Sequence, residues 1–223
     1  MTTLHEAATL LEQFSAGSLT GRISQIEAVL QGQDKQTLQA AGSDLALGSG
    51  LLDAALTLKK AAGQINVTVH ALGILEALPH ILQEAERIEY VSLGAGNTGR
   101  RFDLETNQRV AEFKFITWQG GAEVIRQNSV FKDFYWMAEY ETTKVKYLYV
   151  LGTEYPLRFL SGGRALSSVL SRNNKLLTDF RGKCGNRFTV VRDYYEFRKS
   201  AVRLVDLARI VAELRAGRLQ VEE

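Results

Sequence analysis

A short segment, residues 100–118, constrains this chain most, because it places charged side chains inside two runs that otherwise have the pattern of buried β-strands. The second run, VAEFKFITW, is apolar and aromatic apart from Glu112 and Lys114. Alternate side chains of a strand point to the same face, so Glu112 and Lys114 share one face while Phe113 and Phe115 take the other. Burying an unpaired charge costs several kcal/mol. The segment therefore predicts a site where these charges have partners.

The residues between the two runs predict a hairpin turn. We expect Thr106 and Asn107 to form it, because asparagine tolerates the left-handed conformation that two-residue turns need. This turn places Asp103 opposite Val110, on the face of Glu112, with the two carboxylates diagonal neighbours roughly 5.5–8 Å apart at Cβ. Carboxylates at that separation can share one hard cation, so the segment is a candidate metal site. A three-residue loop would break this parity.

An aspartate on one strand, followed by Glu-x-Lys on the next, resembles the PD-(D/E)xK nuclease superfamily, which has the restriction-endonuclease-like fold. The matched residues are Asp103, Glu112 and Lys114, and Phe102 stands where the family motif has proline. The family core is a helix, a three-stranded antiparallel meander, a second helix and a fourth strand. The sequence predicts the same order over residues 65–152: a helix at 65–84, strands at 87–93, 100–105 and 109–117, a helix at 121–138 and a strand at 144–151.

The resemblance implies an endonuclease that hydrolyses the phosphodiester bonds of nucleic acid, DNA rather than RNA, with Mg²⁺ or Mn²⁺. Asp103 and Glu112 would hold the metal, and Lys114 would orient the attacking water or help to deprotonate it. Many members of the family carry a further glutamate on the first helix. Glu76 is the first candidate for this third metal ligand and Glu84 the second.

Residues 158–199 predict a surface that faces nucleic acid. This stretch carries 10 basic and 3 acidic side chains, interleaved with aromatic residues. Basic groups neutralise phosphates and aromatic faces stack on unpaired bases. The alternative is a solvated basic surface over aromatic core residues. The candidate nucleic-acid-binding residues here and on the preceding helix are Arg126, Gln127, Arg164, Arg172, Lys175, Arg181, Lys183 and Arg187. Gln127 with Phe131 also loosely resembles a Gln-x-x-x-Tyr element of some family members.

As a whole, the sequence predicts an α/β protein of two parts. Residues 63–223 are expected to form the restriction-endonuclease-like core, a central mixed sheet of four to five strands flanked by helices. Residues 1–62 have apolar spacings of three and four, which predict helices that pack on the core or form a homodimer or partner surface. The segment 200–219 has the same spacing and predicts a C-terminal amphipathic helix.

Several protein classes are disfavoured by the sequence. No apolar stretch reaches the ~18 residues that span a bilayer, and residues 1–14 lack the pattern of a secretory signal, so we expect a cytoplasmic protein without a membrane partner. The single cysteine, Cys184, excludes an internal disulfide framework and a multi-cysteine zinc site.

Two alternative functions remain at this point. Residues 94–99 satisfy the spacing G-x-G-x-x-G after an apparent strand, as in a methyltransferase that uses S-adenosylmethionine or a dinucleotide-binding turn. That motif needs a helix at its last glycine, whereas the following residues alternate like a strand, so the loop is interpreted as a connection between strands. The second alternative is a nuclease fold that binds nucleic acid, or serves in an assembly, without cleaving it.

Overall fold

The structure, a computed structural model, describes residues 3–15, 17–33, 49–94, 102–115, 118, 123–212 and 214. The chain divides into two compact units, residues 1–66 and 67–223, whereas the sequence predicted the division after residue 62. The first unit contains helices α1 (Leu4–Ser15), α2 (Leu19–Leu30) and the beginning of α4 (Ser49–Ile81). The Ser18 side chain caps α2 by accepting a hydrogen bond from the Gly21 N–H.

The second unit is an α/β structure, which confirms the predicted fold class at this level. After α4 its strands and helices are β1 (Ile88–Val91), β2 (Leu104–Thr106), β3 (Arg109–Lys114), α5 (Val124–Ala138), β4 (Val145–Val150), α6 (Glu154–Leu160), α7 (Leu166–Leu170), α8 (Asn174–Cys184), α9 (Val191–Arg198), the 3₁₀ turn η1 (Lys199–Ala201), β5 (Arg203–Asp206) and the 3₁₀ turn η2 (Leu207–Arg209).

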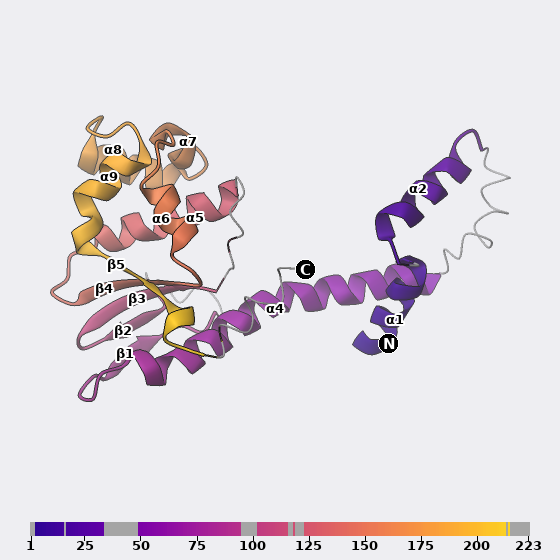
Figure 1. Ribbon diagram of the computed structural model, residues 1–223, viewed down its shortest axis with the longest axis horizontal. Helices are drawn as coiled ribbons and strands as arrows, with labels where there is room; N and C mark the ends of the chain where they lie inside the picture. Colours follow the sequence, from indigo (N-terminus) through magenta and orange to yellow (C-terminus); the bar gives the residue numbers. More distant parts are fainter. Residues whose placement is uncertain are drawn as a thin grey trace. The chain divides into compact units, whose positions relative to one another are not determined.

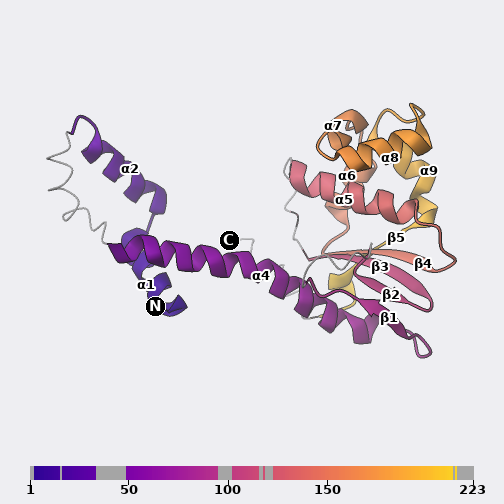
Figure 2. The same cartoon turned by 180° about the vertical axis from the view of Figure 1, so that it is seen from behind.

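The described strands form one mixed sheet in the order β1-β2-β3-β4-β5. The first three are an antiparallel meander, and β4 and β5 then run parallel to β3. A parallel neighbour requires a crossover connection, which α5 provides between β3 and β4. Figures 1 and 2 show α5 to α9 on one face of the sheet and the C-terminal part of α4 on the other.

Each face of the sheet has its own hydrophobic core. Val110 of β3 packs toward α5, with Phe131 and Phe134. Phe113, on the alternate face, packs toward α4 with Ile74, and Phe115 lies against the same core. The predicted separation of Glu112 and Lys114 from the two phenylalanines is therefore confirmed, because strand alternation directs them to opposite sides.

The hairpin turn lies one residue later than predicted. Leu104 pairs with Ala111 and Glu105 with Val110, so Asn107 and Gln108 form the two-residue connection. The Asn107 side chain is held by the backbone N–H of Arg87, 2.9 Å from Oδ1. Continuing this register places Asp103 directly opposite Glu112 rather than diagonal to it. The prediction of Thr106–Asn107 as the turn was wrong. Moving the turn by one residue changes the residue opposite each position of the hairpin by two, and residues two positions apart on a strand point to the same face, so the face predicted for Asp103 does not change.

The C-terminal segment departs most from the prediction. Instead of one amphipathic helix, its described residues form η1, β5 and η2, with residues 213 and 215–223 outside the described part. Val202 and Leu204 pack on the α5 side, while Val205 and Leu207 pack on the α4 side. A strand covered on both faces needs apolar residues in both directions, and this pattern also satisfies helical spacing.

A glycine of α4 makes room for an aromatic ring at the sheet. A Cβ on Gly73 would lie 2.3 Å from Cε1 of Phe115, a separation that real Cβ atoms do not show. The Phe115 ring in turn meets the His70 ring edge-on, with centroids 5.8 Å apart. The close approach of α4 to this part of the sheet therefore depends on glycine.

We expect Gly73→Ala to destabilise the protein by about 1–2 kcal/mol, because overpacking costs about 1–3 kcal/mol and outweighs the ~1 kcal/mol gain in helix propensity. Gly63→Ala is the matched control, since its added Cβ would meet nothing within 4 Å on the same helix. That variant should gain about 0.5–1 kcal/mol. Urea midpoints of the two variants check this, and a stabilised Gly73→Ala would contradict the close contact.

A buried ion pair fastens the turn after α4 to the hairpin. Arg109 donates from Nε and Nη2 to the two carboxylate oxygens of Glu86, each at 2.5 Å, and from Nη1 to the Tyr149 hydroxyl at 2.9 Å. The Thr106 hydroxyl donates to Glu86 Oε1 at 2.6 Å. The Arg109 side chain is 5% exposed and that of Glu86 is fully buried. This pair fixes the turn end of the hairpin, and the candidate site lies at the other end.

Candidate functional site

Five charged or titratable side chains meet at the end of the sheet where the parallel strands β3 and β4 finish. We call Asp103, Glu112, Lys114, Asp133 and His70 the charged cluster. Lys114 is the last residue of β3, Asp103 directly precedes β2, Asp133 comes from α5 and His70 from α4. Ligands of open α/β sheets commonly bind outside the carboxyl ends of the parallel strands, which is the location of this cluster.

Lys114 is the centre of the cluster on the α5 side. Its Nζ lies 3.0 Å from Glu112 Oε1 and 2.8 Å from Asp133 Oδ2. The other oxygen of Asp133 is 3.3 Å from Nζ of Lys132. The exposed fractions of the Lys114, Glu112 and Asp133 side chains are 22%, 14% and 6%. Lys114 is therefore a nearly buried ammonium shared by two carboxylates.

Asp103 joins the two strands and the helix α4. Its Oδ2 accepts a hydrogen bond from the backbone N–H of Phe113 at 2.9 Å, which ties the start of β2 to β3 next to Glu112. Its Oδ1 lies 3.4 Å from Nε2 of His70, an ion pair when the imidazole is protonated. The aspartate is thus oriented by two separate contacts, as a residue that positions a ligand must be.

The surroundings shift the pKa values of two members. Burial and the charges of Asp133 and Asp103 raise the pKa of Glu112 to about 7, although Lys114 opposes the shift. Burial alone would lower the pKa of Lys114, but the Asp133 and Glu112 carboxylates outweigh burial and raise it above its usual value. Glu112 therefore keeps its proton to a higher pH than an ordinary glutamate, while Lys114 stays an ammonium. Strongly shifted groups of this kind are concentrated at functional sites.

The donor set fits a divalent metal ion held in part by substrate. In the described part of the chain, no group of three or more His, Cys, Asp or Glu side chains is arranged to hold a metal by itself. Mg²⁺, however, usually takes only one or two protein carboxylates and completes its shell with water and phosphate oxygens. Asp103 and Glu112 are two neighbouring carboxylates, and the charges of Asp133 and Asp103 add to burial in raising the pKa of Glu112. A cation bound between Asp103 and Glu112 would oppose the part of this shift that comes from charge.

The structure does not bring Glu76 into the cluster. Glu76 is exposed, and the 100° advance per helical residue places it opposite the side of α4 on which Ile74 and Ala77 face the sheet. Glu84, the second candidate, is exposed in the turn after α4. The contact from α4 to Asp103 comes instead from His70.

Arg126 and Gln127, at the start of α5, were predicted to contact phosphate, and each has a side-chain partner within the protein. Arg126 forms an ion pair with Glu123, one turn earlier. The Gln127 side chain accepts a hydrogen bond from Arg164, which also donates to Ser168 at 3.3 Å. Phe131, the other half of the loosely matched Gln-x-x-x-Tyr element, is fully buried in the core and does not accompany Gln127 at the surface.

The basic stretch forms an exposed surface whose aromatic residues mostly belong to the core. Phe180 and Tyr194 are buried in the core, so they cannot stack on bases from the surface, whereas the Phe159 ring lines a cavity. Phe197 is 43% exposed, and the Arg187 guanidinium lies over its ring, 4.1 Å from the ring centroid. The other predicted residues of α7 to α8 and their flanks are exposed at the surface: Arg172, Lys175, Arg181 and Lys183. Their interaction with nucleic acid stays a prediction.

Asp133 and His70 are the members of the cluster that sequence reasoning missed. Asp133 follows Lys132 inside a run of α5, FKDFYWMA, whose other residues are apolar or aromatic, a signal like the one that drew attention to Glu112. His70 precedes Ile74, Ala77 and Ile81 at spacings of four, three and four, which places it on the side of α4 that faces the sheet. The charge within the apolar run and the spacing of His70 are both visible in the sequence, but neither shows which residue Asp133 or His70 contacts.

The glycine loop lies largely outside the described residues. Gly94 is described, with φ of 88°, whereas residues 95–99 are not. Residues 102–106, after the loop, form a bend and then strand β2, where a cofactor-binding turn would have a helix. The arrangement of these residues agrees with a connection between β1 and β2.

The described helices include none with both the length and the apolar character needed to cross a bilayer. Cys184 is half-buried at the end of α8, and burial raises the pKa of its thiol, which disfavours the reactive thiolate. In comparisons with protein-family models, with curated proteins and with solved structures, this chain matches none of them.

Proposed function

We propose that this protein is a metal-dependent nuclease that hydrolyses phosphodiester bonds, with DNA as the first substrate to test. The observation that carries the proposal is the pair of opposed carboxylates, Asp103 and Glu112, beside the buried ammonium of Lys114 at one end of the sheet. The supporting observation is the element order, a helix, an antiparallel three-stranded meander, a helix and a strand, which matches the core that the Asp and Glu-x-Lys motif implies.

In this mechanism Asp103 and Glu112 would hold the metal ion. A bound Mg²⁺ or Mn²⁺ supplies polarisation of the scissile phosphate and a water that ionises near neutral pH. Asp103 keeps its orientation through the Phe113 N–H and His70. These contacts fix one carboxylate before substrate arrives.

Lys114 acts as a cation rather than as a base. Its raised pKa keeps the ammonium protonated, so it is suited to stabilise negative charge that develops on the phosphate oxygens. Asp133 holds the ammonium in place from α5, 2.8 Å away. The expectation that Lys114 helps to deprotonate the water is therefore not part of the proposal.

The test is hydrolysis of single- and double-stranded DNA and RNA by the full chain, with Mg²⁺, Mn²⁺ or EDTA. We expect cleavage that requires the metal and falls by about 10²-fold or more in Asp103→Asn, which keeps the size of the side chain but removes the charge that holds the ion. Asp53→Asn, on α4 in the first unit, is the control and should cleave like the unchanged protein.

Calorimetric titration with Mn²⁺ gives a readout independent of cleavage, and Asp103→Asn should weaken that binding by about 10- to 100-fold. Metal-dependent cleavage that persists in Asp103→Ala, Glu112→Ala and Lys114→Ala would overturn the assignment of the site. Nucleic-acid binding with no cleavage under any of these conditions would favour the alternative of a non-cleaving binding module.

A further inference from the structure

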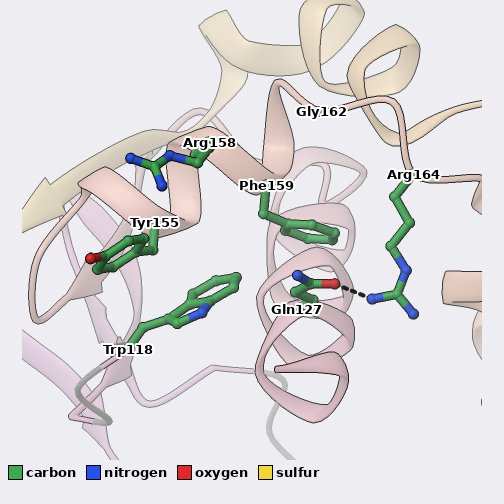
Figure 3. A pocket seen from close by; sticks show the side chains of 7 residues that line it. All are labelled: Trp118, Gln127, Tyr155, Arg158, Phe159, Gly162 and Arg164. Carbon is green, nitrogen blue, oxygen red and sulfur yellow. Dashed lines mark hydrogen bonds between the residues drawn. The ribbon is translucent and has the colours of Figure 1, made fainter. Parts of the chain in front are cut away.

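A cavity beside the charged cluster combines aromatic walls with hydrogen-bond donors. It has a volume of about 230 Å³ and is lined by Trp118, Gln127, Tyr155, Arg158, Phe159, Gly162 and Arg164. Figure 3 shows the three aromatic rings on one side and the bonded pair of Gln127 and Arg164 on the other. The volume is below the ~300–1,000 Å³ of pockets for drug-sized ligands, so the cavity suits a single planar ring system.

The walls of this cavity have the chemistry of a base-binding site. The indole of Trp118 and the ring of Phe159 lie 6.0 Å apart and tilted by 48°, and the Arg158 guanidinium lies 5.2 Å from the centroid of the Tyr155 ring. Aromatic faces and guanidinium planes are the groups on which proteins stack unpaired bases. An aliphatic ligand would gain nothing from the guanidinium groups, and a free anion would gain nothing from the rings.

The cavity also contains a buried donor without a partner. Trp118 is only 7% exposed, and its Nε1–H has no hydrogen-bond acceptor in the described structure. A buried N–H without an acceptor is unfavourable, and native proteins rarely contain one. Arg164 likewise uses its Nη1 and Nη2 groups on Gln127 and Ser168, which leaves further N–H donors of its fork. The remaining Arg164 donors match the acceptor atoms that line the edges of nucleobases.

Trp118 connects this cavity to the charged cluster. The same indole also lines a second, smaller cavity of about 30 Å³, whose other residues include Lys114, Arg126 and Ser129. Lys114 is the proposed cation for the scissile phosphate, and α5 supplies Gln127 to one cavity and Ser129 to the other. A nucleotide next to the scissile phosphate would therefore bring its base toward Trp118.

We propose that this cavity, the Trp118 pocket, binds one unpaired base of the strand that the charged cluster cleaves. The inference rests on the proposed nuclease function and narrows its substrate to a single strand, or to a duplex that releases a base from its stack. A base inside a duplex is stacked on both faces and cannot present itself to Trp118 and Tyr155. The group that the Trp118 pocket would bind is the unpaired base, which a DNA strand and an RNA strand both provide.

The first experiment uses tryptophan fluorescence, because the chain has two tryptophans, Trp118 and Trp136. Trp136→Phe leaves Trp118 as the only emitter, and Trp118→Phe is the matched control that leaves Trp136. Each full-length variant is titrated, in EDTA to prevent cleavage, with a short single strand of DNA or RNA, the same DNA as a duplex, and a single strand that lacks its bases.

We expect the single strands to quench the emission of Trp118 and to leave that of Trp136 unchanged. The duplex and the strand without bases should leave the emission of Trp118 unchanged at the same concentrations. Quenching by the strand without bases, or equal quenching by the duplex, would overturn the inference, because the pocket would then sense the backbone or the helix. Quenching by only the DNA or only the RNA strand would support it and identify the sugar.

The second experiment measures affinity for the same single strand by fluorescence anisotropy. Tyr155→Ala should weaken binding by about 5- to 150-fold, the range found for the loss of one stacking ring. Tyr90→Ala, a half-buried tyrosine on β1 far along the sheet from α6, is the control and should stay within about twofold. Equal binding by Tyr155→Ala and the unchanged protein would overturn the pocket.

The cleavage and binding experiments distinguish a failure of the proposed nuclease function from a failure of the Trp118 pocket. Cleavage that depends on Asp103, together with unquenched Trp118 and an unaffected Tyr155→Ala, overturns the pocket and leaves the nuclease. Quenching of Trp118 and weakened binding by Tyr155→Ala, without cleavage in Mg²⁺ or Mn²⁺, supports the pocket and overturns the nuclease.

Discussion

Replacing Lys114 with methionine is expected to lower metal-dependent cleavage by about 10²–10⁴-fold, the range for losing a preorganised charge at a reacting group. Methionine preserves the length of the side chain without its charge. The matched control is Lys132→Met, because Lys132 also contacts Asp133, at 3.3 Å, but is 41% exposed. That variant should keep its rate within about twofold and its stability within about 0.5 kcal/mol.

Lys114→Met also removes the shared cationic partner of two largely buried carboxylates, Glu112 and Asp133, and breaking a buried pair in this way destabilises by about 3–5 kcal/mol. The double variant Lys114→Met with Asp133→Leu separates part of this loss from the chemistry. Removing both members of the Lys114–Asp133 pair is close to neutral for stability, so the double variant, in which Glu112 still lacks Lys114, should regain part of the stability and none of the cleavage. Recovery of cleavage in the double variant would show that Lys114 only maintains the fold around Asp133.

The common face predicted for Asp103, Glu112 and Lys114 depends on parity rather than on register. The turn lies at Asn107–Gln108 instead of Thr106–Asn107, and this register, continued beyond Leu104, brings Asp103 opposite Glu112 instead of Val110. Moving a hairpin turn by one residue changes each opposing pair by two positions, and side chains two positions apart share a face. The common face of Asp103, Glu112 and Lys114 is therefore insensitive to this error, although their separation is not.

The partners of the hairpin could not be derived from local pattern. His70 and Asp133 reach the cluster from two helices, whereas the sequence prediction chose Glu76, with Glu84 second, because the family carries a glutamate on this helix. Which side of a helix faces the sheet is decided by packing, here by Gly73 under Phe115. Side-chain type alone gives no information about that rotation.

The segment of β5 shows a different limit of local pattern. Its apolar residues Val202, Leu204, Val205 and Leu207 satisfy helical spacing and also contribute to the cores on both faces of an edge strand. Pairing with β4, from Tyr147 opposite Arg203 to Val150 opposite Asp206, favours the strand. Long-range pairing of this kind overrides intrinsic propensity, so the choice depended on the rest of the sheet.

Glu86→Ala is expected to destabilise the protein by about 3–5 kcal/mol, because it leaves the Arg109 guanidinium buried without a carboxylate, beside the Tyr149 hydroxyl and the Tyr147 ring. That loss is a large part of the ~5–15 kcal/mol by which a folded protein is stable. Glu89→Ala is the control, since its ion pair with Lys144 is exposed and Lys144 keeps Glu105 as a second partner. The control should lose about 0–1 kcal/mol in urea unfolding at pH 7.

The same pair makes a prediction about acid. Burial opposes ionisation of Glu86, but the hydrogen bonds from Arg109 and Thr106 outweigh it and lower its pKa below the usual 4.5. A carboxyl whose pKa is lower in the folded state stabilises the fold fully above pH 4.5, and this contribution is lost as the pH falls through the folded-state value. The stability difference between the unchanged protein and Glu86→Gln should therefore be constant from pH 7 to about 5 and shrink below pH 4.5. A difference that stays constant down to the acid limit of the folded state would mean that the charge of Glu86 contributes nothing and that only its shape matters.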